Sequence, residues 1–277
     1  MTSNKNKEVL AFSKTMKRLA IFVCTIILFS LLPSSYASEP IMITKSNDMD
    51  KVIFDGKWTT EREWKKSSWN ELKYDGRIIH LRTAHQGEFI YILADIILDR
   101  TYDHNQDKVT VCFDSKNNKS AVADSDDFCF MVAAGAKRGV ILQGGSKIGF
   151  NNNFQSIQNH PDFIAVGSIS GENNRYSKVP HMIYEMRIPI ELLGRSDVYG
   201  FYFSYYEQNS KKTFTWPQGL EIMRPNQIPI PADWGEIISP DKSLPEFGFP
   251  LLILLPAFIS IILINRFRKH EFFKDTR

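Results

Sequence analysis

Acidic side chains at alternate positions are the first feature of this sequence that could do chemistry. Asp103, Asn105 and Asp107 place three oxygen donors two residues apart, and Asp114 follows eleven residues after Asp103. This spacing matches the order of ligands in a calcium-binding loop. Lys108 stands where such a loop needs a glycine for its sharp turn. The four residues are therefore a candidate calcium site, and a solvated acidic turn is the alternative.

Two cysteines bear on the same region. Cys112 and Cys129 form an even pair, because Cys24 lies in an apolar amino-terminal segment that is expected to be removed. In an oxidising compartment they are expected to form a disulfide, which would stabilise the fold by about 3 kcal/mol in the chain-entropy argument. Two buried free thiols are the alternative. If the cysteines pair their strands, the acidic run 124–127 is expected to converge on the same place as the candidate calcium loop of Asp103, Asn105, Asp107 and Asp114.

The sequence lacks the motifs of common enzyme classes. It has no Gly-x-Ser-x-Gly nucleophile elbow, no His-Glu-x-x-His metal site and no phosphate-binding loop. Glu185 and Glu191 lie near the end of one expected strand, where outward-facing charges are a simpler interpretation than a glycosidase pair. We therefore expect a protein that binds and does not catalyse.

Noncovalent haem is an alternative ligand. The sequence has no Cys-x-x-Cys-His motif for covalent attachment, so a haem would need axial side chains. The residues of the right type are Met131, Met182, Met186, Met223, His80, His85, His104, His160 and His181. Met in strands commonly fills cores, so the sequence does not single out a pair.

Between residues 38 and 241 the pattern is that of strands. Aromatic residues make up 13% of the chain, and β-branched and aromatic runs recur about every ten residues between Gly, Asn and Asp turns. In the run 182–188, odd-numbered positions face one way and even-numbered positions the other. This predicts one all-β domain, an antiparallel β-sandwich of jelly-roll type. The expected strands are 51–54, 78–82, 88–95, 108–113, 127–132, 163–166, 182–188, 199–205, 213–216 and 234–238, with short helical turns at 59–64 and 189–193.

An apolar run near the amino terminus predicts export. Residues 19–32 are a 14-residue apolar segment that follows a cationic stretch and precedes a small-x-small exit at 35–37. This indicates a signal peptide over residues 1–37, cleaved after Ala37. An uncleaved anchor helix is the alternative, but 14 residues would span only about 21 Å of a ~30 Å bilayer core.

A second apolar run predicts attachment to a membrane. Residues 247–264 are 18 residues without a charge, and a basic cluster follows at 265–269. This indicates a transmembrane helix with a cytoplasmic carboxyl end. The domain 38–241 would then lie outside the cell.

The residues before this run carry a resemblance. Pro245, Glu246, Phe247 and Gly248, the apolar run and the basic end together resemble the PEFG-type sorting signal of archaeal surface proteins. The resemblance implies that 242–277 is a sorting tail, which an archaeosortase-like processing enzyme would remove and replace by an anchor.

The charge distribution excludes a nucleic-acid partner. Residues 1–18 sum to +4 and residues 265–277 to +3, whereas the rest of the chain sums to −4. A nucleic-acid-binding domain needs clustered cations to neutralise phosphates.

Five short motifs occur in order along residues 52–238. They are Phe54-Asp55-Gly56-Lys57 with Glu63-Trp64, then 87–92, 106–114, 184–189 and Trp234-Gly235-Glu236. The ordered set resembles carbohydrate-binding module family 9 and the related DOMON-type sandwiches. The resemblance implies a glycan ligand and a structural calcium ion for the first group, or haem for the second.

Family 9 modules hold a sugar between two aromatic faces, with a carboxylate and an arginine on its hydroxyls. The resemblance places Trp216 at one aromatic position. His104, Thr110 and Met131 stand at the positions of the other aromatic residue, the carboxylate and the arginine. These four residues are the predicted ligand site, and an ordinary core or rim aromatic is the alternative for Trp216.

We therefore expect an extracellular, membrane-anchored module that binds carbohydrate or another small ligand. The two alternatives are a haem-binding redox module and a structural envelope protein without a soluble ligand.

Overall fold

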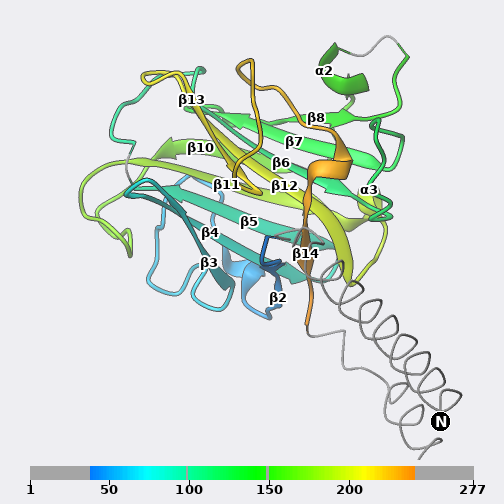
Figure 1. Cartoon of the computed structure of the whole chain (residues 1–277). Coiled ribbons are helices and arrows are strands. Elements are labelled where there is room, and N and C mark those ends of the chain that lie inside the picture. The colour runs from blue at the N-terminus through cyan, green and yellow to red at the C-terminus, as the bar shows by residue number, and fades with distance from the viewer. Residues whose placement is uncertain (1–37, 98, 148–149, 241–277) are drawn as a thin grey trace, which may run out of the picture. The chain divides into compact units, whose positions relative to one another are not determined.

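Two β-sheets pack face to face in the computed structural model, which describes residues 38–97, 99–147 and 150–240 (Figure 1). The 8-stranded sheet contains, in spatial order, β1 (Ile41–Met42), β14 (Gly235–Ile238), β12 (Val198–Glu207), β6 (Lys108–Asp114), β7 (Asp127–Ala133), β8 (Val140–Gln143) and β9 (Gln155–Ile157), with β13 (Lys212–Trp216) also paired to β12. The 6-stranded sheet contains β10 (Ile164–Ile169), β11 (Met182–Pro189), β5 (Phe89–Ile96), β4 (Arg77–Gln86) and β2 (Thr44–Lys45), with β3 (Ser68–Tyr74) also paired to β4. The prediction of an all-β, two-sheet sandwich is confirmed.

Helical elements are short. They are η1 (Met49–Lys51), α2 (Phe150–Asn153), α3 (Ile190–Leu193) and η2 (Pro231–Asp233). Within the described part of the chain, no helix has the length and apolar character that a membrane crossing needs. The expected signal peptide, sorting motif and transmembrane helix all lie outside the described residues.

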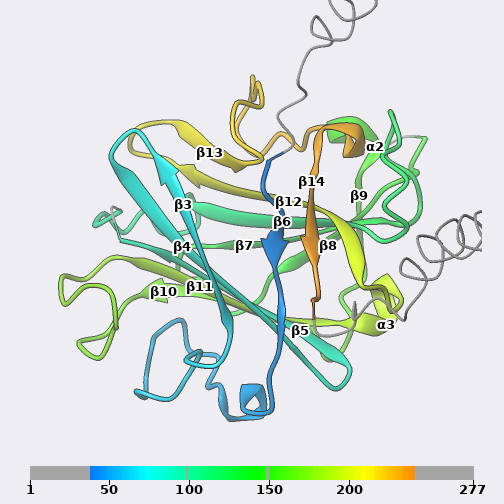
Figure 2. The same cartoon turned by 60° about the horizontal axis from the view of Figure 1, so that its bottom comes forward.

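The strand pairing differs from the prediction at one edge. The long pairs are antiparallel, but β1 runs parallel to β14 and β2 runs parallel to β4. The segment 41–45 passes from one sheet to the other, so this single stretch of chain joins an edge of each (Figure 2). A wholly antiparallel sandwich is therefore the wrong prediction for these two short pairs.

Several expected elements are placed differently. The run 51–54 was expected as a strand, but only Lys51 is regular there, as the end of η1. Met49 and Val52 pack instead against the outer face of the 6-stranded sheet. Residues 61–66 form hydrogen-bonded turns and no helix, whereas α3 confirms the turn expected at 189–193. Pattern alone does not distinguish an apolar run that pairs from one that covers a sheet.

Alternating side chains build the core between the sheets. Val111 and Phe113 of β6 are buried there with Tyr184 and Met186 of β11, and Phe203 of β12 lies among them. The even-numbered face of β11 is therefore the core face, as its alternation indicates.

Loops cover both outer faces. On the 6-stranded sheet, the segment 48–67 packs Trp58 and Trp64 in a second apolar cluster. On the 8-stranded sheet, Phe154 and Trp234 pack in a third. Residues that point away from the core are consequently buried as well, so their polar atoms need partners inside the protein.

Glu185 shows this effect. It lies on the outer face of β11, where we expected a solvated charge, but it is fully buried. Its carboxylate accepts hydrogen bonds from Nε1 of Trp64 at 2.9 Å and from the backbone N–H groups of Gly56 at 2.8 Å and Asp55 at 3.1 Å. Burial raises the pKa of Glu185 to about 8. This carboxyl group therefore fastens the covering segment and is not a surface charge.

Candidate functional site

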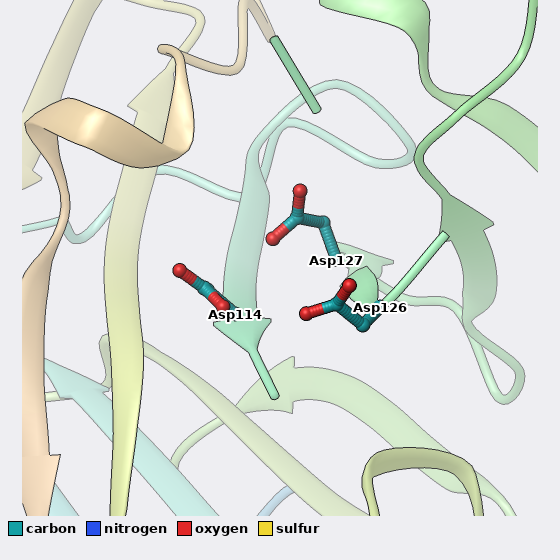
Figure 3. A group of neighbouring side chains, drawn as sticks. All are labelled: Asp114, Asp126 and Asp127. Atoms are coloured by element: carbon teal, nitrogen blue, oxygen red, sulfur yellow. The ribbon is translucent and has the colours of Figure 1, made fainter. Parts of the chain in front are cut away.

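Three carboxylates lie together at one end of β6 and β7. Asp114 ends β6 and is the direct cross-strand partner of Asp127, which begins β7. Asp126 precedes it, and one oxygen of each of the three residues lies within 4.8 Å of the others. Figure 3 shows the three carboxylates around a common space. We call this group the acidic cluster.

Asp127 has an incomplete set of partners. It is fully buried, and its Oδ2 accepts the backbone N–H of Asp124 at 2.7 Å. Its Oδ1 has no hydrogen-bond partner among the described residues. Burial, together with the charges of Asp114 and its acidic neighbours, raises the pKa of Asp127 to about 7. An unpartnered oxygen on a buried carboxyl group calls for a proton or a cation.

The neighbouring carboxylates are better satisfied. Asp114, also fully buried, accepts the backbone N–H groups of Asn118 at 3.2 Å and Lys119 at 2.9 Å. Asp126 forms an ion pair with Lys116 at 2.9 Å, but Nζ of that lysine is on an exposed side chain. Among the described residues, Asp126 thus has an ion-pair partner at the surface, and Asp114 and Asp127 have none.

The donor set fits a hard cation. All three groups are carboxylates, which are the ligands that Ca²⁺ prefers, and waters or backbone carbonyls commonly complete its shell. Gly200 of β12 lies opposite Asp114, and a Cβ there would come within 2.7 Å of the Cβ of Asp114. The absence of a side chain at Gly200 therefore provides the space in which the side chain of Asp114 is buried.

The calcium loop expected at residues 103–107 is not part of the cluster. Asp103, Asn105 and Asp107 precede β6, whereas Asp114 is its last residue. At about 3.3 Å per residue, seven residues of strand separate Asp107 from Asp114 by roughly 23 Å. The four residues therefore cannot share one ion. The run 124–127 was expected to converge on this loop, and Asp126 and Asp127 do lie beside its last residue, Asp114.

The disulfide explains this convergence. Cys112 and Cys129 are bonded, with a Cα–Cα distance of 4.0 Å, and they are cross-strand partners in β6 and β7. Asp114 and Asp127 are the next pair on the same face of the sheet. The predicted disulfide is confirmed.

A second feature is a cleft of about 800 Å³ between two hairpins. Residues of the β3–β4 hairpin line one wall, and residues of β13 and of the segment after it line the other. Figure 2 shows the backbone of these elements. Tyr74 and Phe214 lie in it with ring centroids 5.4 Å apart at an angle of 66°. Both rings are partly buried and rest on the core, so they form an apolar floor.

Hydrogen bonds across the sheets hold the two walls. The hydroxyl of Tyr74 donates to the carbonyl of Thr215 at 3.0 Å, and the side-chain amide of Gln218 donates to the carbonyl of Lys73 at 2.7 Å. The cleft is therefore already shaped without a ligand. Thr213 and Asp75 add a hydroxyl and a carboxylate to its lining.

Trp216 does not line this cleft. It is 6% exposed, belongs to the core between the sheets and packs on Phe201 with ring centroids 5.8 Å apart. Gly235 lies against its ring, where a Cβ would come within 2.4 Å. The ring therefore has no open face for a sugar, and the core alternative for Trp216 is the one found.

The other residues of the predicted ligand site lie elsewhere. Thr110 and Met131 are cross-strand partners in β6 and β7, on the face opposite to the core. His104 is exposed in the β5–β6 loop, edge to face with Tyr102 at 5.6 Å. Because Trp216 points into the core, the four residues do not form one site.

The Met and His residues considered for haem are also separated. Met182 and Met186 are fully buried in the core, whereas His181 lies on another side of the 6-stranded sheet and is bonded to Asp95. Met223 is 74% exposed. These residues do not share a pocket in the described part of the chain.

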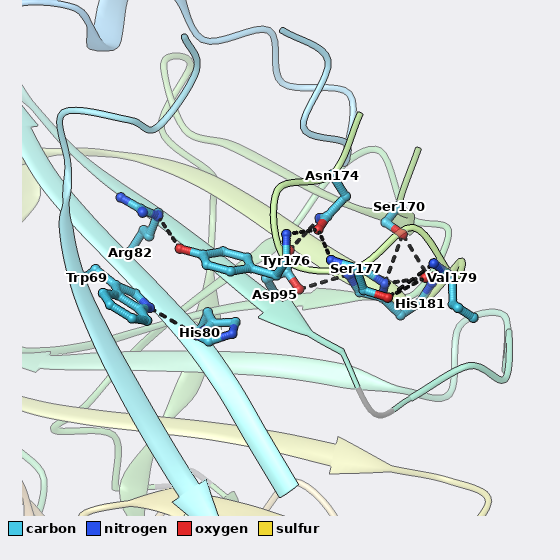
Figure 4. A network of polar contacts seen from close by, with 10 residues as sticks. All are labelled: Trp69, His80, Arg82, Asp95, Ser170, Asn174, Tyr176, Ser177, Val179 and His181. Atoms are coloured by element: carbon cyan, nitrogen blue, oxygen red, sulfur yellow. Dashed lines mark hydrogen bonds and ion pairs between the residues drawn. The ribbon is translucent and has the colours of Figure 1, made fainter. Parts of the chain in front are cut away.

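A polar network occupies the outer face of the 6-stranded sheet. Nε2 of His181 lies 2.8 Å from Oδ1 of Asp95, and Asn174 donates to the other oxygen of Asp95 at 2.6 Å (Figure 4). Tyr176 stacks on His80 with ring centroids 3.8 Å apart. These hydrogen bonds and the ring stack connect the segment 170–181 to the sheet, so the network stabilises the fold.

Trp69 borders this network and is 55% exposed. Its ring stacks on Tyr176 with centroids 6.3 Å apart, and its Nε1 donates to Nδ1 of His80 at 3.0 Å. It is an exposed aromatic surface outside the cleft. Trp69 and the β3 side of the cleft do not follow from the sequence, because β3 was not predicted as a strand, whereas Phe214 lies in the predicted strand 213–216.

A scan against protein-family models finds no match for the sequence, and a search of curated proteins finds none. The chain is similar to a solved carbohydrate binding module family 9 from Caldicellulosiruptor kristjanssonii in complex with cellotriose, with a TM-score of 0.47 and 16% identity, over 73% of this chain and 93% of that one. It is similar to a structure of such a module in complex with glucose, with a TM-score of 0.46 and 16% identity, over 73% and 95% of the two chains.

Proposed function

We propose that this chain is a noncatalytic carbohydrate-binding module that uses the cleft between the β3–β4 hairpin and β13. The observation that carries the proposal is the aromatic floor of Tyr74 and Phe214 inside a cleft of about 800 Å³ with a polar rim. Sugar rings present C–H faces that pack on aromatic rings, and polar side chains bind their hydroxyl groups. The volume lies in the range of small-ligand sites.

The module acts outside the cell in this proposal. The signal-peptide pattern over 1–37, the apolar run 247–264 and the PEFG-type motif at 245–248 support export and anchoring at a membrane. The Cys112–Cys129 disulfide is in keeping with an oxidising compartment. An archaeosortase-like enzyme would process the tail. A reporter inserted beside Lys178 should be reached by an impermeant label on intact cells, and a cytosolic reporter would refute this placement.

Calcium is the ion we propose for the acidic cluster. Asp114, Asp126 and Asp127 would hold it, and its charge would balance two fully buried carboxylates at the ends of β6 and β7. Its role would be to brace the loop between these strands.

Glycan-array binding by the purified protein tests the sugar proposal. Phe214→Leu keeps an apolar side chain on the core but removes the aromatic face, so it should weaken binding at least about fivefold. Trp69→Leu is the matched control, because it removes an exposed aromatic ring outside the cleft and should leave binding unchanged.

Three results would count against the proposal. Loss of binding in Trp69→Leu alone would move the site to the outer face of the 6-stranded sheet. A blank array together with self-association would favour a structural envelope protein. A Soret band in the purified protein would favour the haem alternative.

A further inference from the structure

The cleft is basic although the domain is not. Residues 38–240 carry 23 Lys and Arg against 26 Asp and Glu. Four cationic side chains nevertheless line this one cleft, which are Lys73, Arg77, Lys211 and Lys212, and Asp75 is the acidic residue among its lining residues. A local excess of one charge inside a cleft raises the local concentration of ligands of the opposite charge.

Arg77 is held with its guanidinium toward the aromatic floor. Its Nη1 donates to Oε2 of Glu207 at 2.8 Å, and its Cζ lies 5.4 Å from the centroid of Phe214. Glu207 is 6% exposed and also accepts the hydroxyl of Ser210. The other guanidinium N–H groups of Arg77 have no protein acceptor in the described part of the chain. A planar guanidinium group that is held in place and has free N–H donors suits a carboxylate or a sulfate.

Lys211 and Lys212 supply charge without internal compensation. Both are exposed, and neither forms an ion pair with another described residue. Lys73, in contrast, is paired with Glu71 at 3.1 Å. The β12–β13 turn therefore presents two uncompensated cations to the cleft, next to the ring of Phe214.

We infer that the ligand of this cleft is an acidic polysaccharide whose sugar ring rests on Tyr74 and Phe214 and whose carboxylate or sulfate group is bound by Arg77, Lys211 and Lys212. The inference rests on the proposed function and specifies its ligand class. A neutral sugar would use the floor and leave the lysines without a partner. An anionic sugar uses both features at once.

Binding of the purified full-length protein to matched polymers tests the inference. The probes are polygalacturonate, its fully methyl-esterified form and a sulfated galactan, each at two salt concentrations. The wild type should bind an acidic polymer at least about tenfold more tightly than the esterified polymer. Added salt should weaken the acidic binding and leave the neutral binding unchanged. Tight binding of polygalacturonate assigns a carboxylate, and tight binding of the galactan assigns a sulfate.

Two charge-matched variants give the specificity control. Lys211→Gln with Lys212→Gln should weaken binding of the acidic polymer about tenfold. Lys137→Gln with Arg138→Gln removes the same charge from an exposed turn outside the cleft and should leave binding unchanged. Equal weakening in both pairs would reduce the effect to nonspecific attraction and overturn the inference.

The inference and the proposed function fail in different ways. Equal binding of esterified and free polymers, with a loss in Phe214→Leu, would keep a sugar site and overturn the acidic ligand. No binding of any of the three polymers, and none on the glycan array, would overturn both.

Discussion

Asp114 and Asp127 face each other directly across β6 and β7, two residue pairs beyond the disulfide between Cys112 and Cys129 and on the same face of the sheet. Both carboxyl groups are fully buried, and Oδ1 of Asp127 has no partner among the described residues. Two buried acids at adjacent positions repel each other unless one is protonated or a cation lies between them. This relationship should make the stability of the domain depend on pH and, if the proposed calcium ion binds, on that cation.

Calcium should stabilise the wild type through this pair. We expect its melting temperature to rise with CaCl₂, because an ion that binds only the folded state at 100 times its Kd stabilises by about 2.7 kcal/mol. Asp127→Asn should lose this response, and Asp162→Asn, a change of an exposed aspartate, should keep it. Differential scanning calorimetry with CaCl₂ or EDTA measures the effect. A wild type that does not respond would remove calcium from the cluster.

Without metal, the same pair should give a defined pH dependence. The pKa of Asp127 is raised to about 7, so the folded state binds a proton that the unfolded state releases near its ordinary pKa. In EDTA-treated protein, the contribution of Asp127 to the free energy of unfolding should therefore be greatest below about pH 4. It should be lost as the pH rises to about 7. The loss is on the order of 4 kcal/mol. Asp127→Asn cannot ionise and should show a flatter profile in urea titrations. Parallel profiles for the two proteins would contradict the assignment.

Glu185→Gln should destabilise the domain even though it removes no charge at neutral pH, where burial keeps Glu185 protonated by raising its pKa to about 8. The amide group that replaces one carboxylate oxygen cannot accept a hydrogen bond from Trp64 or Gly56. A buried donor left without an acceptor costs about 1–3 kcal/mol. Glu191→Gln changes an exposed carboxylate and serves as the control. Equal urea midpoints for the two variants would show that the buried bonds do not fasten the covering segment.

Trp216 should affect stability and not ligand specificity. Trp216→Ala removes a large ring from the core and should cost about 3–5 kcal/mol of folding free energy. Trp216→Phe preserves most of the packing and should bind glycans as the wild type does. Calorimetry paired with glycan binding separates the two roles. A folded Trp216→Phe protein that no longer binds would return Trp216 to the site.

The fold class was accessible from the sequence, because alternation is a local property. The runs that became β6, β7 and β11 already show a two-residue period, and cysteines in two of these runs indicated that those strands are neighbours. Strands with few apolar residues could not be predicted from the sequence. In β3, polar and apolar residues do not alternate cleanly, because the exposed face carries Trp69 and the face of Leu72 carries the polar Asn70. Half of the cleft was missed for this reason.

The acidic cluster shows a second limit. Spacing along the chain suggested a loop that holds Asp103, Asp107 and Asp114 together. Instead, the strand β6 separates Asp114 from the other two residues. The true neighbours, Asp126 and Asp127, come from the next strand and are brought in by register. Distances within a strand are set by the covalent chain, whereas distances between strands depend on which residues pair.

The sequence by itself determined the strand period, the two-sheet class and the cysteine pair, since these follow from side-chain alternation and from residue type. Only the tertiary structure decided which face of each strand meets the other sheet and which face a loop covers. Trp216 and Thr215 are adjacent and both buried, yet the ring of Trp216 lies in the core whereas the carbonyl of Thr215 helps to shape the cleft. Pairing between distant strands sets that choice, and no local pattern contains it.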